Sequence, residues 1–443
     1  MKTLNLLAVK NNCQKAFKQI ANIGLLFRKL LKDGFMHVFI GTVLNQAVAM
    51  VSSVVIARVV SKAQYAYLGY SDTIYGYLLM FSGMGLSTAV LKVCSGRERS
   101  EKDGPYLKFA LKRGLTFQVL VSMILVIIST SVVLPFEQAK FYIYLTAAYP
   151  TMYFIREVQL SYVRSKQKNK SYALISFLQV VVVSTLSIIF VLLLDAYGVI
   201  IARYIATVVV VVIGYKYIKP AFSDKCQILL TKQEKRELLI MAVTLAISNA
   251  FSGMMSFNEN LLVSNIIANE EISSNFRVAS HFPHLVLLIT HAVNIYYFPI
   301  IAEDANCSNP VKKKVIRIGV FNFMLVGIAV LTGIIISPHL IHFLYGEKYM
   351  SAVSIMKPLW GMRGINAGIR MVPMNMLIAI GKYRFNLFMS MIALFFQTVM
   401  DWIFINKYGI IGVVYGGIGV YVLTGFMYWI YFVYSTSKRK VNN

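Results

Sequence analysis

Long runs of apolar residues constrain this chain more than any other feature of its sequence. From Val180 to Leu194 there is no charged residue, and comparable runs recur along the 443 residues. A helix that crosses a bilayer needs about 20 mostly apolar residues, so a composition that is 58% hydrophobic suffices for about a dozen crossings. Charged residues make up 14% of the chain, against about 25% in soluble domains. The apolar runs also lack the period of two that a membrane β-barrel requires. A soluble enzyme, a β-barrel and a disordered chain are therefore excluded.

The breaks between apolar runs predict an all-α membrane protein with twelve transmembrane helices in two six-helix bundles. Each boundary is set where charged or turn-forming residues interrupt the apolar pattern. The expected helices are residues 35–57, 71–91, 114–134, 141–163, 171–194, 197–217, 239–267, 281–302, 318–337, 353–379, 385–405 and 410–434.

Basic residues are distributed unevenly between the two sides of this topology. One side, which includes both termini, receives 33 Lys and Arg. The other receives six, and these are Arg58, Lys62, Lys140, Arg277, Lys348 and Lys407. Because cytoplasmic loops collect Lys and Arg, both termini are expected in the cytoplasm. The same rule explains most of the net charge of +26, so nucleic-acid binding is not expected.

A central polar stretch divides the chain into two halves. We predict a basic amphipathic arm over 1–34 that lies on anionic lipids. A first bundle over 35–218, a linker over 219–238, a second bundle over 239–436 and a cytoplasmic tail over 437–443 follow.

The two halves show a trace of internal repetition. The sequence of residues 196–201, AYGVII, recurs as KYGIIG at residues 407–412. An even number of helices in each half makes such repeats parallel, with a pseudo-twofold axis along the membrane normal. Chance similarity between apolar segments is the alternative.

Arginines inside the predicted spans are candidates for binding an anionic substrate. A charge at mid-bilayer is costly and usually faces a cavity, and guanidinium groups bind phosphate oxygens in bidentate fashion. Arg363, Asn366 and Arg370 share one face of their predicted helix, as do Tyr149, Tyr153 and Arg156 of an earlier helix, and Arg203 is a further candidate. The alternatives are that Arg156 pairs with Glu157 and that Arg203 reaches an interface.

A second group of polar residues suggests an ion-coupling site. Glu259, flanked by Asn258 and Asn260, is expected to be the only carboxylate well inside the second half's helices. It is a candidate proton or cation site, or else the structural partner of an arginine. His284 and His291 lie on one face of the eighth predicted helix and are candidates for proton transfer, although simple packing is the slightly favoured alternative.

Catalytic and cofactor motifs are not expected in this chain. No outer loop is long enough for a catalytic domain, and no Walker loop or paired-carboxylate constellation occurs. The four cysteines, Cys13, Cys94, Cys226 and Cys307, have no zinc-ligand spacing. We therefore expect no enzyme activity, no metal site and no cofactor.

Several short motifs carry a resemblance to a known family. They are Arg58-Val59-Val60-Ser61, the segment GMGLSTAV at 83–90, FRVA at 276–279, FPIIA at 298–302, LYGEKY at 344–349 and KYGIIG at 407–412. In this order and at these helix ends, they resemble the bacterial polysaccharide-transport flippases of the O-antigen type, over essentially the whole chain. These belong to the multidrug/oligosaccharidyl-lipid/polysaccharide exporter superfamily. One departure is Glu259, where relatives commonly carry Asp.

The resemblance implies a flippase in the bacterial cytoplasmic membrane. Its substrate would be a polyprenyl-diphosphate-linked oligosaccharide for O-antigen, capsule or exopolysaccharide synthesis. A polysaccharide polymerase and a chain-length regulator are implied partners, and a proton or sodium ion the coupling cation. Two alternatives remain. One is a cation-coupled drug antiporter of the same superfamily, which would need acidic residues in its cavity to bind organic cations. The other is a membrane glycosyltransferase or polymerase, which would usually need a large catalytic loop.

Overall fold

The computed structural model describes residues 35–95, 100–222, 229–303 and 308–438. The predicted arm over 1–34 and the last five residues of the tail lie outside the described residues, so both remain predictions. The predicted bundle and linker boundaries also remain predictions.

Helices account for all the regular structure in these four described stretches, and together they make twelve crossings. Some crossings are broken into two helices, whereas α8 makes two crossings with a kink between them. The helices are α2 (Phe35–Val59), α3 (Lys62–Leu79), α4 (Leu86–Val93), α5 (Asp103–Ser131), α6 (Ala139–Thr146), α7 (Tyr149–Ser165), α8 (Asn169–Phe222), α9 (Lys232–Ile267), α10 (Glu270–His284), α11 (Val286–Glu303), α12 (Ser308–Tyr345), α13 (Ala352–Ile365), the π-helical segment Asn366–Arg370, α14 (Met371–Ala379), α15 (Tyr383–Tyr408) and α16 (Gly412–Lys438). Short 3₁₀ turns lie at Ser82–Gly85, Glu347–Tyr349 and Gly409–Ile411.

Length and hydropathy are consistent with this count of crossings. Six continuous segments of the described chain are long and apolar enough to cross a membrane. Two of them, 170–222 and 384–437, contain 53 and 54 residues. At about 1.5 Å per residue, each amounts to roughly 80 Å of helix, enough for two crossings of a hydrocarbon core about 30 Å thick. The more polar or interrupted helices α2, α6–α7, α9 and α13–α14 make the remaining crossings.

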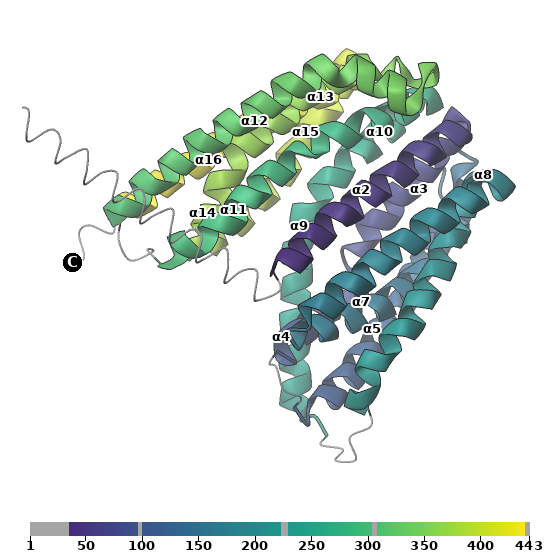
Figure 1. Ribbon diagram of the computed structural model, residues 1–443, viewed down its shortest axis with the longest axis vertical. Coiled ribbons are helices and arrows are strands. Elements are labelled where there is room, and N and C mark those ends of the chain that lie inside the picture. The colour runs from purple at the N-terminus through teal and green to yellow at the C-terminus, as the bar shows by residue number, and fades with distance from the viewer. Residues whose placement is uncertain (1–34, 96–99, 223–228, 304–307, 439–443) are drawn as a thin grey trace, which may run out of the picture.

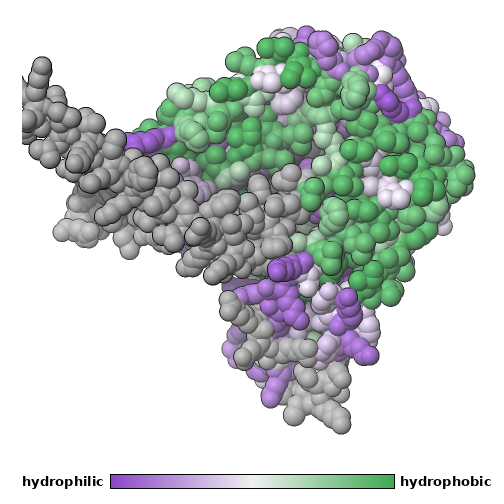
Figure 2. Space-filling model, in the orientation of Figure 1, coloured by the Kyte–Doolittle hydropathy of each residue, from purple (hydrophilic) through white to green (hydrophobic). Residues whose placement is uncertain are grey.

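The helices form two six-helix bundles arranged as a V. In Figure 1 the bundles lie close together where α3, α10 and α13 are labelled, and they diverge toward α4 on one side and α14 on the other. Many large apolar side chains are exposed on the outer faces, for example Leu192, Val212, Phe321 and Ile328. Figure 2 shows this apolar surface over both bundles, with hydrophilic residues gathered at the two ends. Such a surface suits a lipid environment, and the chain is a multi-pass membrane protein.

The start of α3 determines where its polar residues lie in the membrane. Ser61 accepts a hydrogen bond from the Gln64 backbone, and the Gln64 side chain accepts one from the Ser61 backbone. This capping box begins the helix at Lys62, nine residues before the predicted start at 71. Asp72, expected at a helix end, therefore lies ten residues inside α3.

The crossing formed by α3 and α4 is broken at Gly83-Met84-Gly85. All three residues have left-handed backbone angles, with φ of 54°, 53° and 76°. A Cβ atom at Gly85 would lie 2.3 Å from the Ala242 carbonyl oxygen of α9, so the glycine permits close contact between these helices. Leu238 and Ala242 of α9 pack in the same apolar cluster as Leu86 of α4. The first part of α9 is thus attached to the N-terminal bundle.

Candidate functional site

A cavity of about 370 Å³ lies between the two bundles. Helices α2, α3, α9, α10 and α13 line it. Its charged lining residues are Asp72, Arg277 and Arg363, and His281 and His284 also lie on its wall. A second cavity, of about 470 Å³, lies within the N-terminal bundle and shares Asp72 and Arg277 with the first.

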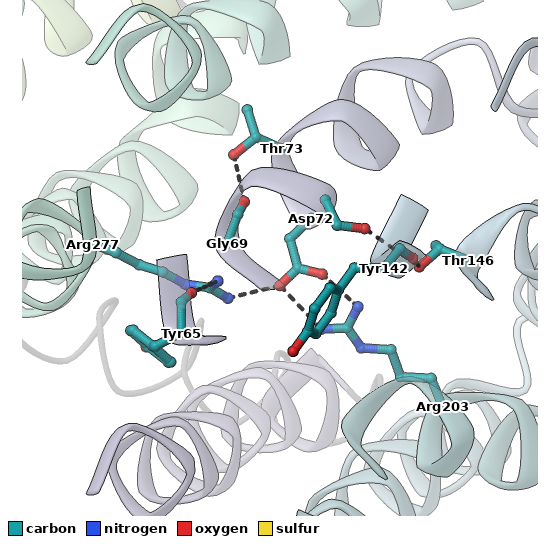
Figure 3. Close-up of polar contacts among 9 residues, drawn as sticks. Tyr65, Gly69, Asp72, Thr73, Tyr142, Thr146, Arg203 and Arg277 are labelled. Carbon is teal, nitrogen blue, oxygen red and sulfur yellow. Dashed lines mark hydrogen bonds and ion pairs between the residues drawn. The ribbon is translucent and has the colours of Figure 1, made fainter. Parts of the chain in front are cut away.

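Asp72 pairs with two arginines, Arg203 from its own bundle and Arg277 from the C-terminal bundle. Arg203 of α8 donates to both carboxylate oxygens of Asp72, at 2.5 and 3.1 Å. Arg277 of α10 donates from Nη2 to Oδ2 of Asp72, at 2.7 Å. Figure 3 shows Asp72 between the two guanidinium groups, which approach it from opposite sides. Two cations share one anion here, so the group carries an excess of one positive charge where the cavities meet.

Arg277 is held in place by the N-terminal bundle as well. Its guanidinium carbon lies 4.6 Å from the centre of the Tyr65 ring, a cation–π distance. Its Nη1 also donates to the Tyr65 carbonyl oxygen at 3.4 Å. The sequence reasoning assigned Arg277 to an outer loop, and this was wrong because α10 begins at Glu270 rather than at 281. The helix cap at Asn269, which accepts a hydrogen bond from Ile272, was the missed signal.

The tyrosine and arginine face of α7 lies in the second cavity. Tyr149, Tyr153 and Arg156 all line it, together with Arg203. Arg156 forms an ion pair with Glu157 at 2.5 Å and lies 4.5 Å from the centre of the Tyr153 ring. The alternative in which Arg156 pairs with Glu157 therefore occurs, while Arg156 still faces the cavity.

The C-terminal bundle holds a second ion pair, deeply buried. Arg363 of α13 donates to both carboxylate oxygens of Glu259 on α9, at 3.1 and 2.5 Å. Glu259 also accepts from Gln397 at 3.0 Å and from Tyr421 at 3.3 Å. Glu259 is fully buried and Arg363 is 4% exposed. Glu259 is therefore the structural partner of an arginine, which was the alternative to a proton or cation site.

Asp401 was missed by the sequence reasoning. This residue of α15 is fully buried and interacts electrostatically with Glu259 and Arg363. The expectation that Glu259 is the only carboxylate well inside the second half's helices is therefore wrong. Neither Asp401 oxygen has a hydrogen bond of normal geometry among the described residues, although the Gln397 side chain lies near enough to interact with it, and Oε1 of Gln397 is likewise without a hydrogen bond. Three acceptor oxygens without such a bond thus lie one helical turn apart on α15.

Arg370 is buried in the C-terminal bundle and lines neither cavity. Its Nη1 donates to Asn366 at 3.3 Å, across the π-helical segment. It is 6% exposed and lies over the rings of Tyr421 and Tyr428, at 5.6 and 5.9 Å. Within the described part of the chain it forms no ion pair. Tyr421 contacts both Arg363 and Arg370. The two arginines predicted to share one helix face are therefore linked through this tyrosine.

The remaining candidates are dispersed. Asn258 bridges two helices by accepting from Tyr77 at 3.2 Å and donating to Thr398 at 3.1 Å, whereas Asn260 lines the cavity between the bundles. His284 lines the same cavity, but His291 is exposed and lines neither. The structure therefore does not bring the two histidines to one wall. No cluster of three metal-ligating side chains occurs among the described residues.

The end at which the bundles meet is closed by polar contacts. Lys348, in the turn after α12, donates to the carbonyl oxygens of Ala57 and Val60 at the end of α2. Arg58 donates in the opposite direction, to the Phe343 carbonyl oxygen at 2.5 Å. These contacts satisfy carbonyl groups that a helix end leaves free, and they tie the two bundles together.

Comparisons with known proteins agree with this architecture. A family model described as "Polysaccharide biosynthesis protein" matches residues 30–304. An inward-facing multidrug resistance MATE family transporter of the MOP superfamily has a similar structure, with a TM-score of 0.72 and 15% identity, over 90% of this chain and 96% of that one. An outward-facing conformation of such a transporter gives a TM-score of 0.59 at 14% identity, over 92% and 95%.

A third similar structure comes from Pyrococcus furiosus Vc1. It is a MOP superfamily transporter described as having a binding pocket of reversed polarity that suggests a different function. Its TM-score is 0.62 at 14% identity, and the match covers 92% of this chain and 96% of that one. Comparison with curated protein sequences finds no match. The family model covers well over half of the 443 residues, and the chain therefore belongs to the polysaccharide biosynthesis protein family, with a fold like that of these transporters.

Proposed function

We propose that the protein is a flippase for polyprenyl-diphosphate-linked oligosaccharides in the bacterial cytoplasmic membrane. It would move repeat units from the cytoplasmic to the outer leaflet for O-antigen, capsule or exopolysaccharide synthesis. A polymerase and a chain-length regulator would act on the delivered units, and anionic lipids would hold the basic arm.

The observation that best supports this proposal is that Arg203 and Arg277 both donate hydrogen bonds to Asp72, where the two cavities meet. Among the described residues, four arginines and one aspartate are the charged residues that line the two cavities. Glu157 and Glu259 neutralise two of the arginines, and the remaining excess lies at Arg203 and Arg277. A diphosphate supplies oxygens that guanidinium groups bind with two parallel hydrogen bonds. Displacing Asp72 from one arginine would free that group for phosphate.

Alternating access fits the arrangement of the two bundles. The described chain resembles the inward-facing transporter more closely than the outward-facing one, with TM-scores of 0.72 and 0.59. With both termini in the cytoplasm, the V opens toward the cytoplasm and the Lys348 contacts close the outer side. The glycan and diphosphate would enter the polar cavity, while the lipid tail stays in the bilayer.

A coupling cation would bind beside Glu259 in the C-terminal bundle. Arg363 already neutralises Glu259, whereas the unpaired oxygens of Asp401 and Gln397 are available to a proton or sodium ion. Asp401→Asn should therefore keep the protein folded and abolish the dependence of transport on an imposed ion gradient. Asp195→Asn, at an exposed turn in α8, is the control. If transport by Asp401→Asn depends on the ion gradient as it does in the wild type, the coupling cation does not bind at this site.

A cation-coupled drug antiporter is the second candidate, favoured by the fold alone. Its cavity would be expected to carry negative charge for organic cations, and here arginines predominate. The Pyrococcus furiosus transporter with a pocket of reversed polarity supports the view that the fold accepts ligands of different charge.

Reconstituted vesicles separate the two candidates. The purified protein is placed in liposomes that contain an undecaprenyl-diphosphate-linked oligosaccharide, and its appearance in the opposite leaflet is followed with an impermeant glycosidase. Efflux of ethidium from parallel vesicles is the comparison. Movement of the lipid-linked glycan without ethidium efflux supports the flippase. Ethidium efflux without glycan movement would replace it by the antiporter.

A further inference from the structure

Two tyrosine hydroxyls of α3 donate hydrogen bonds across the interface between α3 and α9. Tyr70 donates to Oδ1 of Asn265 at 3.1 Å, and Tyr77 donates to Oδ1 of Asn258 at 3.2 Å. The two tyrosines are seven residues apart on α3, and the two asparagines are seven residues apart on α9. Seven residues make about two helical turns, or about 10 Å of helix. The two pairs are therefore successive contacts along one interface.

The deeper of these two contacts joins the N-terminal bundle to the C-terminal bundle. A Cβ atom at Gly76 of α3 would lie 2.3 Å from the Phe257 ring of α9, so the glycine lets the two helices approach closely. The Tyr77 ring lies 6.0 Å from the same phenylalanine ring. Glu259, two residues further along α9, pairs with Arg363 of the C-terminal bundle. Separation of the bundles at this level would therefore break the hydrogen bond from Tyr77.

Asn258 and Asn265 differ in what their amide nitrogens contact. Nδ2 of Asn258 donates to Oγ1 of Thr398 on α15 at 3.1 Å, and the Thr398 hydroxyl donates in turn to the Leu394 carbonyl oxygen at 2.9 Å. Nδ2 of Asn265 instead donates to the Leu261 carbonyl oxygen of its own helix at 2.8 Å. The contact at Asn258 therefore continues into the C-terminal bundle, whereas the contact at Asn265 leads back to α9.

Thr398 lies beside the proposed site of the coupling cation. It follows Gln397, whose amide nitrogen donates to Glu259 at 3.0 Å, and it precedes Asp401 by three residues on α15. Residues three apart lie on the same side of a helix, so a movement of α15 at Asp401 also moves Thr398 relative to Asn258. Asn258 is 6% exposed, which leaves little room for water to replace a hydrogen bond that it loses.

We infer that Asn258 is a positioning residue that transmits the state of the cation site to the contact between the bundles, an inference that rests on the cation site of the proposed function. Its amide accepts from Tyr77 of one bundle and donates to Thr398 of the other. A cation at Asp401 shifts Thr398, and the amide of Asn258 follows it and changes the strength of the contact with Tyr77. The Tyr70 contact closes the same interface but has no link to the cation.

The test follows the opening of the outer side in the full-length protein. In a background without native cysteines, Ala49→Cys places a thiol on the wall of both cavities, and an impermeant maleimide is added outside right-side-out membrane vesicles. Sodium is compared with choline at one pH, and pH 6 with pH 8 in choline. Each labelling rate is divided by the rate of the same thiol in unfolded protein. We expect sodium or the proton to change the rate at least about fivefold, and Asp401→Asn to abolish this response.

Three further substitutions separate transmission from simple closure. Tyr77→Phe should raise the labelling rate without the cation about two- to tenfold, because it removes one contact between the bundles, and it should lose the cation response. Thr398→Val keeps the contact with Tyr77, so it should lose the response without raising that rate. Tyr70→Phe is the matched control, since it removes the other contact and should raise the rate but keep the full response.

The outcomes distinguish the role of Asn258 from the cation site itself. A response that persists in Tyr77→Phe or in Thr398→Val would overturn the inference and leave the cation site intact. Equal loss of the response in Tyr70→Phe would also overturn it, since any weakening of the interface would then suffice. Thr398→Ser keeps the hydroxyl and should keep the response, which a merely structural effect of Thr398→Val does not require. No response in the Ala49→Cys protein, or a normal response in Asp401→Asn, would contradict the proposed cation site and the role of Asn258 with it.

Discussion

Arg363 and Glu259 form a bidentate ion pair inside the C-terminal bundle, with nitrogen–oxygen distances of 3.1 and 2.5 Å. The pair joins α13 to α9, and Gln397 and Tyr421 add further hydrogen bonds to the carboxylate. The four side chains come from α9, α13, α15 and α16. The pair therefore fixes how four helices of the bundle pack, in addition to placing a guanidinium group on the cavity wall.

Breaking this pair should destabilise the protein strongly. Removal of one partner from a buried ion pair costs roughly 3–5 kcal/mol, because the other charge stays buried and unpaired. We expect Glu259→Gln and Arg363→Gln each to lower the unfolding temperature sharply, and the double variant to lose less than the sum. Glu271→Gln is the control, since its pair with Lys62 is exposed and should contribute at most about 1 kcal/mol. Additive losses in the double variant would show that the two residues are not coupled.

The contact between Lys102 and Glu234 should depend on pH. Glu234 lies before the predicted seventh span and accepts from Lys102 at 2.6 Å. Hydrogen bonds from Lys102, and then from Thr231, lower the pKa of Glu234 from 4.5 to about 2. A carboxyl group with a lowered pKa stabilises the fold above about pH 4.5, and this stabilisation is lost as the pH falls toward 2. The difference in unfolding temperature between the wild type and Glu234→Gln should therefore shrink between pH 6 and pH 2.5. A difference that stays constant would contradict the lowered pKa.

Lys348 should hold the outer side closed. Because it donates to two carbonyl oxygens at the end of α2, Lys348→Met should raise the fraction of outward-open molecules. A cysteine introduced at Ala49, which lines both cavities, in a background without native cysteines, reports this opening to an impermeant maleimide added outside. Lys407→Met is the control, since Lys407 lies over the Tyr408 ring of its own helix. An unchanged labelling rate in Lys348→Met would exclude the closing role.

The distribution of basic residues, 33 against six, predicts that both termini lie in the cytoplasm. An alkaline phosphatase fused after Lys440 should be inactive, and one fused after Lys348 should be active, because the enzyme folds only outside the cytoplasm. The reverse pattern of activities would place both termini outside.

The apolar runs were sufficient to predict the number and order of the crossings, but not their ends. Several helices begin before their apolar run. A helix cap starts each of them in polar residues, and these residues are helical too. The Ser61 capping box and the Asn269 cap are two such starts. Both were outside the predicted helices, so Asp72 and Arg277 were assigned to a helix end and a loop. The central ion pair was missed for this reason.

The sequence indicates which charged and aromatic residues lie within the spans, but not which residues pair with them. Arg156, Arg203, Tyr149 and Tyr153 all reach the cavity inside the N-terminal bundle. Helical periodicity within one helix indicates which residues share a face, but it carries no information about the helix opposite. The partners of Arg203 and Arg363 lie 131 and 104 residues away in the chain. Only the packed fold brings them together.

In the proposed function, Arg203 and Arg277 bind the diphosphate of a lipid-linked glycan. The most direct measurement is the rate at which an undecaprenyl-diphosphate-linked oligosaccharide crosses the membrane of reconstituted vesicles, per inserted molecule. In the Arg203→Ala, Arg277→Ala, Asp72→Asn variant, which leaves no buried charge of the group unpaired, we predict a rate at least about tenfold below the wild type. Replacing both arginines by lysine should recover only part of it, since an ammonium group keeps the charge but loses the bidentate geometry. A triple variant that moves the lipid at the wild-type rate would contradict the account.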